Sequence, residues 1–163
     1  MNKYIGISED RLHHILSVAK ECYEIAKSEG FNENFCRKMF MIGWNHDIGY
    51  EFSKTQIEHP KISSELIHQL LCFKTIYDTT IPPKTNHAIY YHGQLPDESL
   101  LFNDEWRILN IADLTIDSKG NKVGIRKRLE DIKNRYGKHS NQYIMASELA
   151  VKIGLIDNKS GQK

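Results

Sequence analysis

Six histidine and aspartate side chains in this sequence are spaced so that they could close a metal site. His46 and Asp47 are adjacent, and the other four flank them at His14, His59, His92 and Asp113. Histidine supplies a nitrogen ligand and aspartate a hard anionic oxygen, a combination that suits Mn, Fe, Zn or Mg with bound water. A lone His-Asp pair is a common accident, so the inference depends on the whole set.

Helical periodicity runs through almost all of the sequence and places these side chains on different elements. We expect helices over residues 8–30, 32–49, 60–71, 87–92, 106–116, 123–136 and 140–153. Ser8, Asn32 and Asp104 are the expected N-caps of the first, second and fifth helices. Strand signals are weak. The sequence therefore predicts an all-α, single-domain helical bundle over residues 1–163, with the motifs in 8–117 and C-terminal helices in 122–154.

The position of the His-Asp pair within its helix limits what the pair can do. Neighbouring side chains on a helix diverge by about 100°, so His46 and Asp47 can share a metal only where the helix ends or is distorted. The second helix is expected to stop near Gly49, which puts the pair at such an end. Asp113 lies among apolar positions, and an acid buried there needs a compensating charge such as a metal ion.

Composition restricts the functional classes. A chain of 163 residues with 40% hydrophobic and 26% charged residues is typical of one soluble domain. The net charge of +1 disfavours an extended nucleic-acid interface. Cys22, Cys36 and Cys72 are an odd number without C-x-x-C spacing, which indicates a reducing compartment. No signal peptide or membrane-spanning stretch is visible, so we expect a cytoplasmic protein without a membrane partner.

The ordered motifs resemble those of the HD superfamily of metal-dependent phosphohydrolases. Arg11-x-x-His14-x-x-x-Val18 is similar to the first motif, His46-Asp47-Ile48-Gly49 to the second, and Ile111-Ala112-Asp113 to the last. The resemblance covers residues 8–117. The segment from Lys127 to Gly137 also resembles one that follows the Asp motif in uncharacterised bacterial members. The resemblance implies the HD-domain fold and hydrolysis of a phosphate ester or anhydride.

The resemblance also implies a ligand set. His14, His46, Asp47 and Asp113 would hold one metal, and Asp47 would bridge to a second metal held by His59 and His92. Two ions per chain are expected, with a single ion as the alternative. Such a centre activates a water molecule as the nucleophile, so no organic cofactor is needed.

The sequence departs from the family pattern around the second motif. Many members carry Lys after the His-Asp-x-Gly phrase, whereas this chain has Tyr50. Arg11, one turn before His14, and Lys61, two residues after His59, are therefore the candidates to hold a phosphate. A Gly-Tyr-Pro phrase is missing after His92, which sets cyclic dinucleotides aside.

Other polar residues carry weaker signals. We interpret three histidines, His13, His68 and His139, as surface residues, and leave His87 without a role. Asp117 either caps the loop that follows or acts near the site. The basic run Arg126-Lys127-Arg128 is interpreted as a solvated helix face.

The expected function is hydrolysis of a small phosphorylated substrate, with a nucleotide as the expected class. Dinucleoside polyphosphates are one candidate, followed by nucleoside monophosphates and guanosine alarmones. A homodimer is an open alternative to a monomer. Two alternatives from other classes are a non-catalytic module of the same fold that binds a nucleotide or a protein, and a metal site that only stabilises the fold. Closed structural zinc sites are usually rich in Cys, which argues against the latter.

Overall fold

The computed structural model describes residues 7–53, 58–72, 83–95 and 103–157, and over these ranges the chain is helical without strands. An isolated bridge joins Ile116 to Lys122. The helices are α1 (Glu9–Ser28), α2 (Glu33–Asn45), the 3-10 helix η1 (Ile48–Glu51), α3 (His59–Cys72), α4 (Pro83–Tyr90), α5 (Asp104–Asp113), α6 (Ile125–Tyr136) and α7 (Asn141–Lys152). The prediction of an all-α protein is confirmed.

Side-chain caps explain where several helices begin. Ser8 accepts a hydrogen bond from the Arg11 amide, and Asn32 accepts one from the Phe35 amide, as predicted. The prediction of Asp104 as the cap of α5 is wrong by one residue. Asn103 is the cap, and its side chain accepts from the Trp106 amide at 3.0 Å. Either residue type can cap a helix, so the sequence alone did not separate them.

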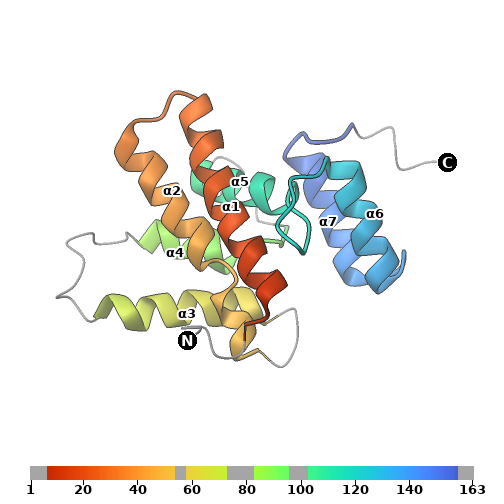
Figure 1. Ribbon diagram of the computed structural model, residues 1–163, viewed down its shortest axis with the longest axis horizontal. Coiled ribbons are helices and arrows are strands. Elements are labelled where there is room, and N and C mark those ends of the chain that lie inside the picture. The colour runs from red at the N-terminus through yellow and green to blue at the C-terminus, as the bar shows by residue number, and fades with distance from the viewer. Residues whose placement is uncertain (1–6, 54–57, 73–82, 96–102, 158–163) are drawn as a thin grey trace.

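The helices are arranged in two parts (Figure 1). α1 and α2 form a hairpin, with α5 packed against α1 and the pair α3 and α4 to one side. At the other end of the molecule α6 and α7 pack on each other. A cluster of buried side chains that includes Trp106, Met39 and Leu149 extends through both parts.

The approach of α1 to α2 is close because a glycine lies between them. A Cβ added at Gly43 would lie 2.7 Å from the Ala19 Cα and 3.1 Å from the Cys22 Sγ. Cys22 and Cys36 are buried, free thiols, whereas the side chain of Cys72 lies outside the described residues. The close packing of α1 on α2 therefore brings the first and second motifs near each other.

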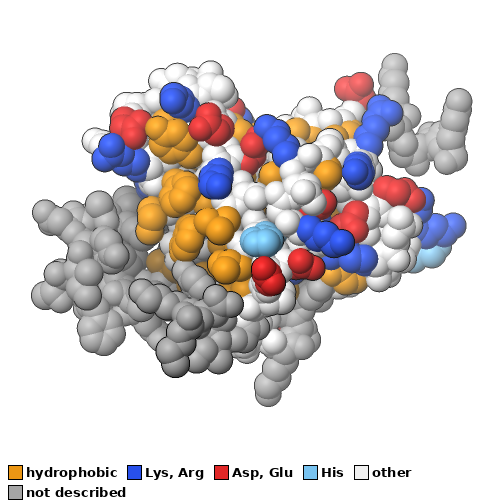
Figure 2. Space-filling view, in the orientation of Figure 1, with side chains coloured by type: hydrophobic (Ala, Val, Ile, Leu, Met, Phe, Trp, Pro, Cys, Tyr) orange, Lys and Arg blue, Asp and Glu red, His pale blue; other side chains and the backbone are white. Residues whose placement is uncertain are grey.

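The surface carries charges of both signs. Figure 2 shows Lys and Arg side chains interspersed with Asp and Glu on the visible face, while hydrophobic side chains gather over α2, where Met41 is 44% exposed. Among the described helices, none combines the length and the apolar character required to cross a bilayer.

Candidate metal centre

The structure brings all six predicted ligands together from five helices, and all but His14 lie at or beside a helix end. His14 lies on α1, the His46-Asp47 pair follows α2, and His59 begins α3. His92 lies two residues after α4, and Asp113 is the last residue of α5. Two overlapping groups have ligand atoms within 4.8 Å of one another, namely His14, His46 and Asp113, and His46, Asp47 and His92. Residues far apart in sequence thus form one buried cluster.

The backbone after α2 explains how adjacent side chains reach one centre. α2 ends at Asn45, and His46 keeps helical angles as its C-cap. Asp47 departs from them, with φ −108° and ψ 5°, before η1 begins at Ile48. Because Asp47 is outside the regular helix, its side chain does not have to diverge from that of His46 by a full helical step. The predicted end of the helix at the pair is confirmed.

Asp47 lies between the two groups of histidines. Its Oδ1 atom is 3.1 Å from the Nε2 of His59 and 3.4 Å from the Nε2 atoms of both His46 and His92. Its Oδ2 atom is 3.7 Å from the Nε2 of His14. The two carboxylate oxygens therefore face different sets of histidines, an arrangement suited to a bridging ligand.

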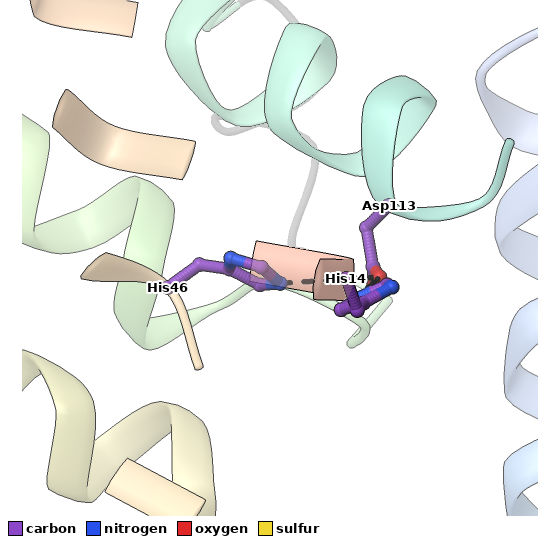
Figure 3. Close-up of side chains that lie close together, drawn as sticks. All are labelled: His14, His46 and Asp113. Carbon is purple, nitrogen blue, oxygen red and sulfur yellow. Dashed lines mark ion pairs between the residues drawn. The ribbon is translucent and has the colours of Figure 1, made fainter. Parts of the chain in front are cut away.

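Asp113 completes the first group from the opposite side. Figure 3 shows His14, His46 and Asp113 with their polar ends directed toward one another. The Asp113 Oδ1 is 3.1 Å from the His14 Nε2 and 4.0 Å from the His46 Nε2. Two ligands that each lie about 2.1 Å from one ion are about 3.0 to 3.4 Å apart. The spacings around Asp47 and Asp113 are thus close to those of a metal coordination shell.

Backbone carbonyls determine the tautomers of three of the histidines. The Nδ1 atoms of His14, His46 and His92 lie 2.8, 2.7 and 2.6 Å from the carbonyl oxygens of Asp117, Gly43 and Ile89. A carbonyl oxygen only accepts, so each Nδ1 carries the proton and donates it. In the neutral rings, Nε2 is then left with a lone pair that points into the cluster.

Two of these lone pairs are suited to binding a cation. The Nε2 atoms of His14 and His46 are buried and have no hydrogen-bond partner among the described residues. Burial lowers the pKa of His46 to about 4, so its ring is neutral at neutral pH. Its lone pair therefore faces carboxylate oxygens that are also acceptors, and a metal ion between them satisfies both. The residues present fit a divalent metal.

The carboxylates are held in the ionised form that a metal requires. Burial alone would raise the pKa of Asp47, but His46 and Arg11 outweigh burial and hold that pKa well below its usual range. Burial likewise opposes ionisation of Asp113, and the adjacent His14, together with His46 and Arg128, lowers its pKa below the ordinary value. No cysteine belongs to either group of the described residues, so the donor set is His and carboxylate, unlike a thiolate-rich structural zinc site.

Tyr50 lies in a stack beside the second group. Its ring packs at 3.9 Å on the ring of His59, with an interplanar angle of 19°, and the Arg11 guanidinium lies 4.0 Å from the centroid of the Tyr50 ring. Arg11 also donates a 2.6 Å hydrogen bond to the Oδ2 of Asp47. Tyr50 thus lies between the Arg11 guanidinium and the predicted ligand His59.

The two predicted phosphate-holding residues lie in different places. Arg11 lines a cavity of about 170 Å³ that opens onto Asp47, His59, His92 and Asp113. Lys61 does not line it, because its side chain is 62% exposed and lies 3.9 Å from Glu65 on the outer face of α3. The structure therefore brings Arg11 to the centre and leaves Lys61 outside.

Sequence reasoning missed the part of the cavity formed by the C-terminal helices. Arg128 and Arg135 of α6 and Asn141 and Gln142 of α7 line the cavity opposite the histidines. The interpretation of Arg128 as part of a solvated face is wrong, because this side chain is only 10% exposed. No local signal marked this burial, because Arg128 stands within the basic run Arg126-Lys127-Arg128.

The polar residues with weaker sequence signals lie mostly at the surface of the described part of the chain. His13 and His139 are exposed, as predicted, whereas the side chain of His68 lies outside the described residues. His87 is exposed and its ring lies edge-on to Tyr91. Asp117 caps its loop by accepting from the amides of Lys119 and Asn121, while its backbone carbonyl fixes the tautomer of His14.

Comparisons of the chain with protein-family models, with curated proteins and with solved structures found no match.

Proposed function

We propose that this protein is a metal-dependent phosphohydrolase of the HD-domain type that cleaves a phosphate ester or anhydride of a small molecule, with a nucleotide as the expected substrate class. The observation that carries the proposal is the convergence of buried, unpartnered Nε2 atoms with two ionised carboxylates beside a cavity. The order of Arg11, His14, His46-Asp47 and Asp113 along the chain supports the HD type.

Each side chain has a role in this proposal. His14, His46, Asp47 and Asp113 would hold one ion, and His59 and His92, together with Asp47, would hold a second. When bound, divalent ions of this kind lower the pKa of water and neutralise charge on phosphoryl oxygens. Imidazole donors suit Zn and Fe, and carboxylate donors suit Mn and Mg.

The reaction adds water across a phosphorus–oxygen bond. A bond forms between the water oxygen and phosphorus, the bond to the leaving oxygen breaks, and the leaving oxygen ends with a proton. Arg11 lines the cavity beside Asp47, and its guanidinium has five donors, of which the bond to Asp47 uses one. Arg11 is therefore the residue proposed to bind and orient the phosphoryl group.

The size of the cavity favours a compact group at the centre. Its volume is about 170 Å³. Sites that enclose drug-sized ligands are larger, at about 300 to 1,000 Å³. The cavity therefore accommodates a phosphoryl group and adjoining atoms, and the rest of a dinucleoside polyphosphate, nucleoside monophosphate or guanosine alarmone would extend beyond it.

Metal content and phosphate release test the proposal together. Elemental analysis of the purified protein and Mn-dependent phosphate release from a nucleotide panel are measured for wild type, Asp47→Ala and Asp10→Ala. Asp10 is exposed on the first turn of α1 and serves as the matched control. Asp47→Ala removes a ligand, so activity should fall by more than the ~10- to 100-fold typical of outer-shell changes.

The outcomes separate the alternatives. Two equivalents of metal with Asp47-dependent turnover support the dinuclear hydrolase, and about one equivalent would reassign His59 and His92 to substrate contacts. Metal binding without turnover of any substrate in the panel would favour the non-catalytic binding module. Absence of metal after reconstitution with Mn, Fe, Zn and Mg would contradict the proposal.

A further inference from the structure

The cavity has a second polar wall that the metal centre does not use. One wall carries Asp47, His59, His92 and Asp113, and the opposite wall is formed by α6 and α7. Two arginines, Arg128 and Arg135, belong to this second wall. They are seven residues apart on α6, which is about two helical turns, so they project from the same face.

Arg128 is buried with most of its donors unused. Its side chain is 10% exposed, and its Nε atom is buried without a hydrogen-bond partner among the described residues. One terminal nitrogen donates to Asp131 at 3.2 Å, and the other lies 3.9 Å from the Oδ1 of Asp113, beyond hydrogen-bond distance. A buried cation with unused donors is costly unless a ligand pairs with it.

Arg135 is attached to the same carboxylate. Its guanidinium donates to the Asp131 Oδ2 at 2.6 Å, and Asp131 thus contacts both arginines. The side chain of Arg135 is 33% exposed at the open side of the cavity. One carboxylate therefore holds two guanidinium groups in place, and this trio of side chains keeps one net positive charge beside the cavity.

We propose that Arg128 and Arg135 form a second anion subsite, which binds a phosphate of the leaving group while the metal centre holds the phosphoryl group that is cleaved. This inference rests on the proposed phosphohydrolase function and narrows its substrate class to molecules with a second phosphate, that is, phosphoanhydrides or bisphosphates. Arginine suits the role because its planar fork of donors matches phosphate oxygens. The neutral Asn141 and Gln142 on the same wall add no charge of either sign.

Direct binding of a matched pair of probes tests the subsite. Isothermal titration calorimetry on the full chain with saturating Mn compares methylenediphosphonate, whose P–C–P linkage resists hydrolysis, with methylphosphonate, which has one anionic group. The variants are Arg128→Gln and Arg135→Gln, with Arg126→Gln as the control because Arg126 is exposed on the same helix and does not line the cavity. Arg135→Gln keeps the test valid if loss of the buried Arg128 impairs folding.

The cavity variants should lose affinity only for the probe that carries a second anionic group. Each cavity variant should lose about tenfold or more in affinity for methylenediphosphonate, the change expected when a hydrogen bond to a charged group is lost. Affinity for methylphosphonate and metal content should stay as in wild type, and Arg126→Gln should bind both probes normally. Tighter binding of methylenediphosphonate than of methylphosphonate by the wild type does not by itself test the subsite, because two phosphonates can also chelate two ions.

Two results would overturn the subsite. Equal losses for both probes would show that the arginines bind no second anion, and a fall in metal content would make Arg128 a positioning residue for Asp113. Failure of the subsite is distinguishable from failure of the function. Phosphate release with unchanged diphosphonate binding in the variants rejects only the subsite, whereas arginine-dependent binding without any turnover rejects only the hydrolase.

Discussion

At the scale of single residues, backbone carbonyls orient the histidines of the candidate metal centre. Carbonyl oxygens of Gly43, Ile89 and Asp117 each accept a hydrogen bond from a histidine Nδ1, which directs the Nε2 atom of each ring into the cluster. Such second partners fix both the tautomer and the ring orientation of a ligand. Because these acceptors are main-chain atoms, no side-chain substitution removes them directly, and the local backbone conformation determines the chemistry.

His59 stacks on the ring of Tyr50, which gives a prediction for the second ion. In Tyr50→Leu the ring that stacks on His59 and under Arg11 is lost. Aromatic stacking and cation–π contacts each contribute about 0.5 to 1.5 kcal/mol. The second equivalent of Mn should therefore bind about tenfold more weakly, measured by competition with a fluorescent chelator.

Tyr50→Phe is the matched control for this prediction. Phenylalanine keeps the ring and removes the hydroxyl, whose pKa is raised by burial and by the charge of Asp47, so it stays protonated in the wild type. The Phe variant should bind both ions as the wild type does. Equal weakening in the Phe and Leu variants would assign the effect to the hydroxyl, against the stacking explanation.

At the scale of elements, the ligands depend on how closely α1 and α2 approach. His14 projects from α1 and His46 ends α2, and their rings lie 5.6 Å apart between centroids. Gly43 permits this approach because it has no Cβ to contact Ala19, and its carbonyl also holds the Nδ1 proton of His46. One glycine thus contributes both to packing and to the site.

Gly43→Ala should therefore lower both stability and metal affinity. Its added Cβ would lie 2.7 Å from the Ala19 Cα, so the helices must separate, which typically costs about 1 to 3 kcal/mol in unfolding free energy. Chemical denaturation and Mn titration measure the two effects. Gly124→Ala is the control, since a Cβ there meets nothing within 4 Å. Because Gly124 is the N-cap of α6, this variant should lose about 0.5 to 1 kcal/mol of stability but no Mn affinity. Similar losses in both variants would contradict the packing argument.

The helices were predictable from sequence because their signals are local. Ser8 and Asn32 cap the first two helices as predicted, and the pair His46-Asp47 lies where α2 ends. The fourth helix stops at Tyr90, two residues before the predicted end, and His92 lies in the turn that follows. The six candidate ligands could be chosen because their order resembles the motifs of one family of metal-dependent enzymes.

At the scale of the whole molecule, the cavity could not be predicted in the same way. Its second wall depends on how α6 and α7 pack beside the core, and periodicity shows only that each helix has an apolar face. Arg128 in a run of basic residues has the pattern of a surface residue, and only the tertiary arrangement buries it. Lys61 is the opposite case. It lies near the candidate ligand His59 in sequence, but its side chain is on the outer face of α3.

Metal binding should also stabilise the entire fold, because the six ligands come from elements throughout the chain and no unfolded conformation brings them together. A metal at about 100 times its dissociation constant stabilises the native state by about 2.7 kcal/mol. For a chain of this size each kcal/mol shifts Tm by about 2 to 4 °C, so Mn should raise Tm by about 5 to 10 °C over the chelator-treated protein. Thermal unfolding followed by circular dichroism measures this shift.

The shift should disappear in Asp47→Ala and persist in Asp10→Ala. An Mn-dependent shift of equal size in all three proteins would mean that the ion binds elsewhere, and the six residues would then require another explanation.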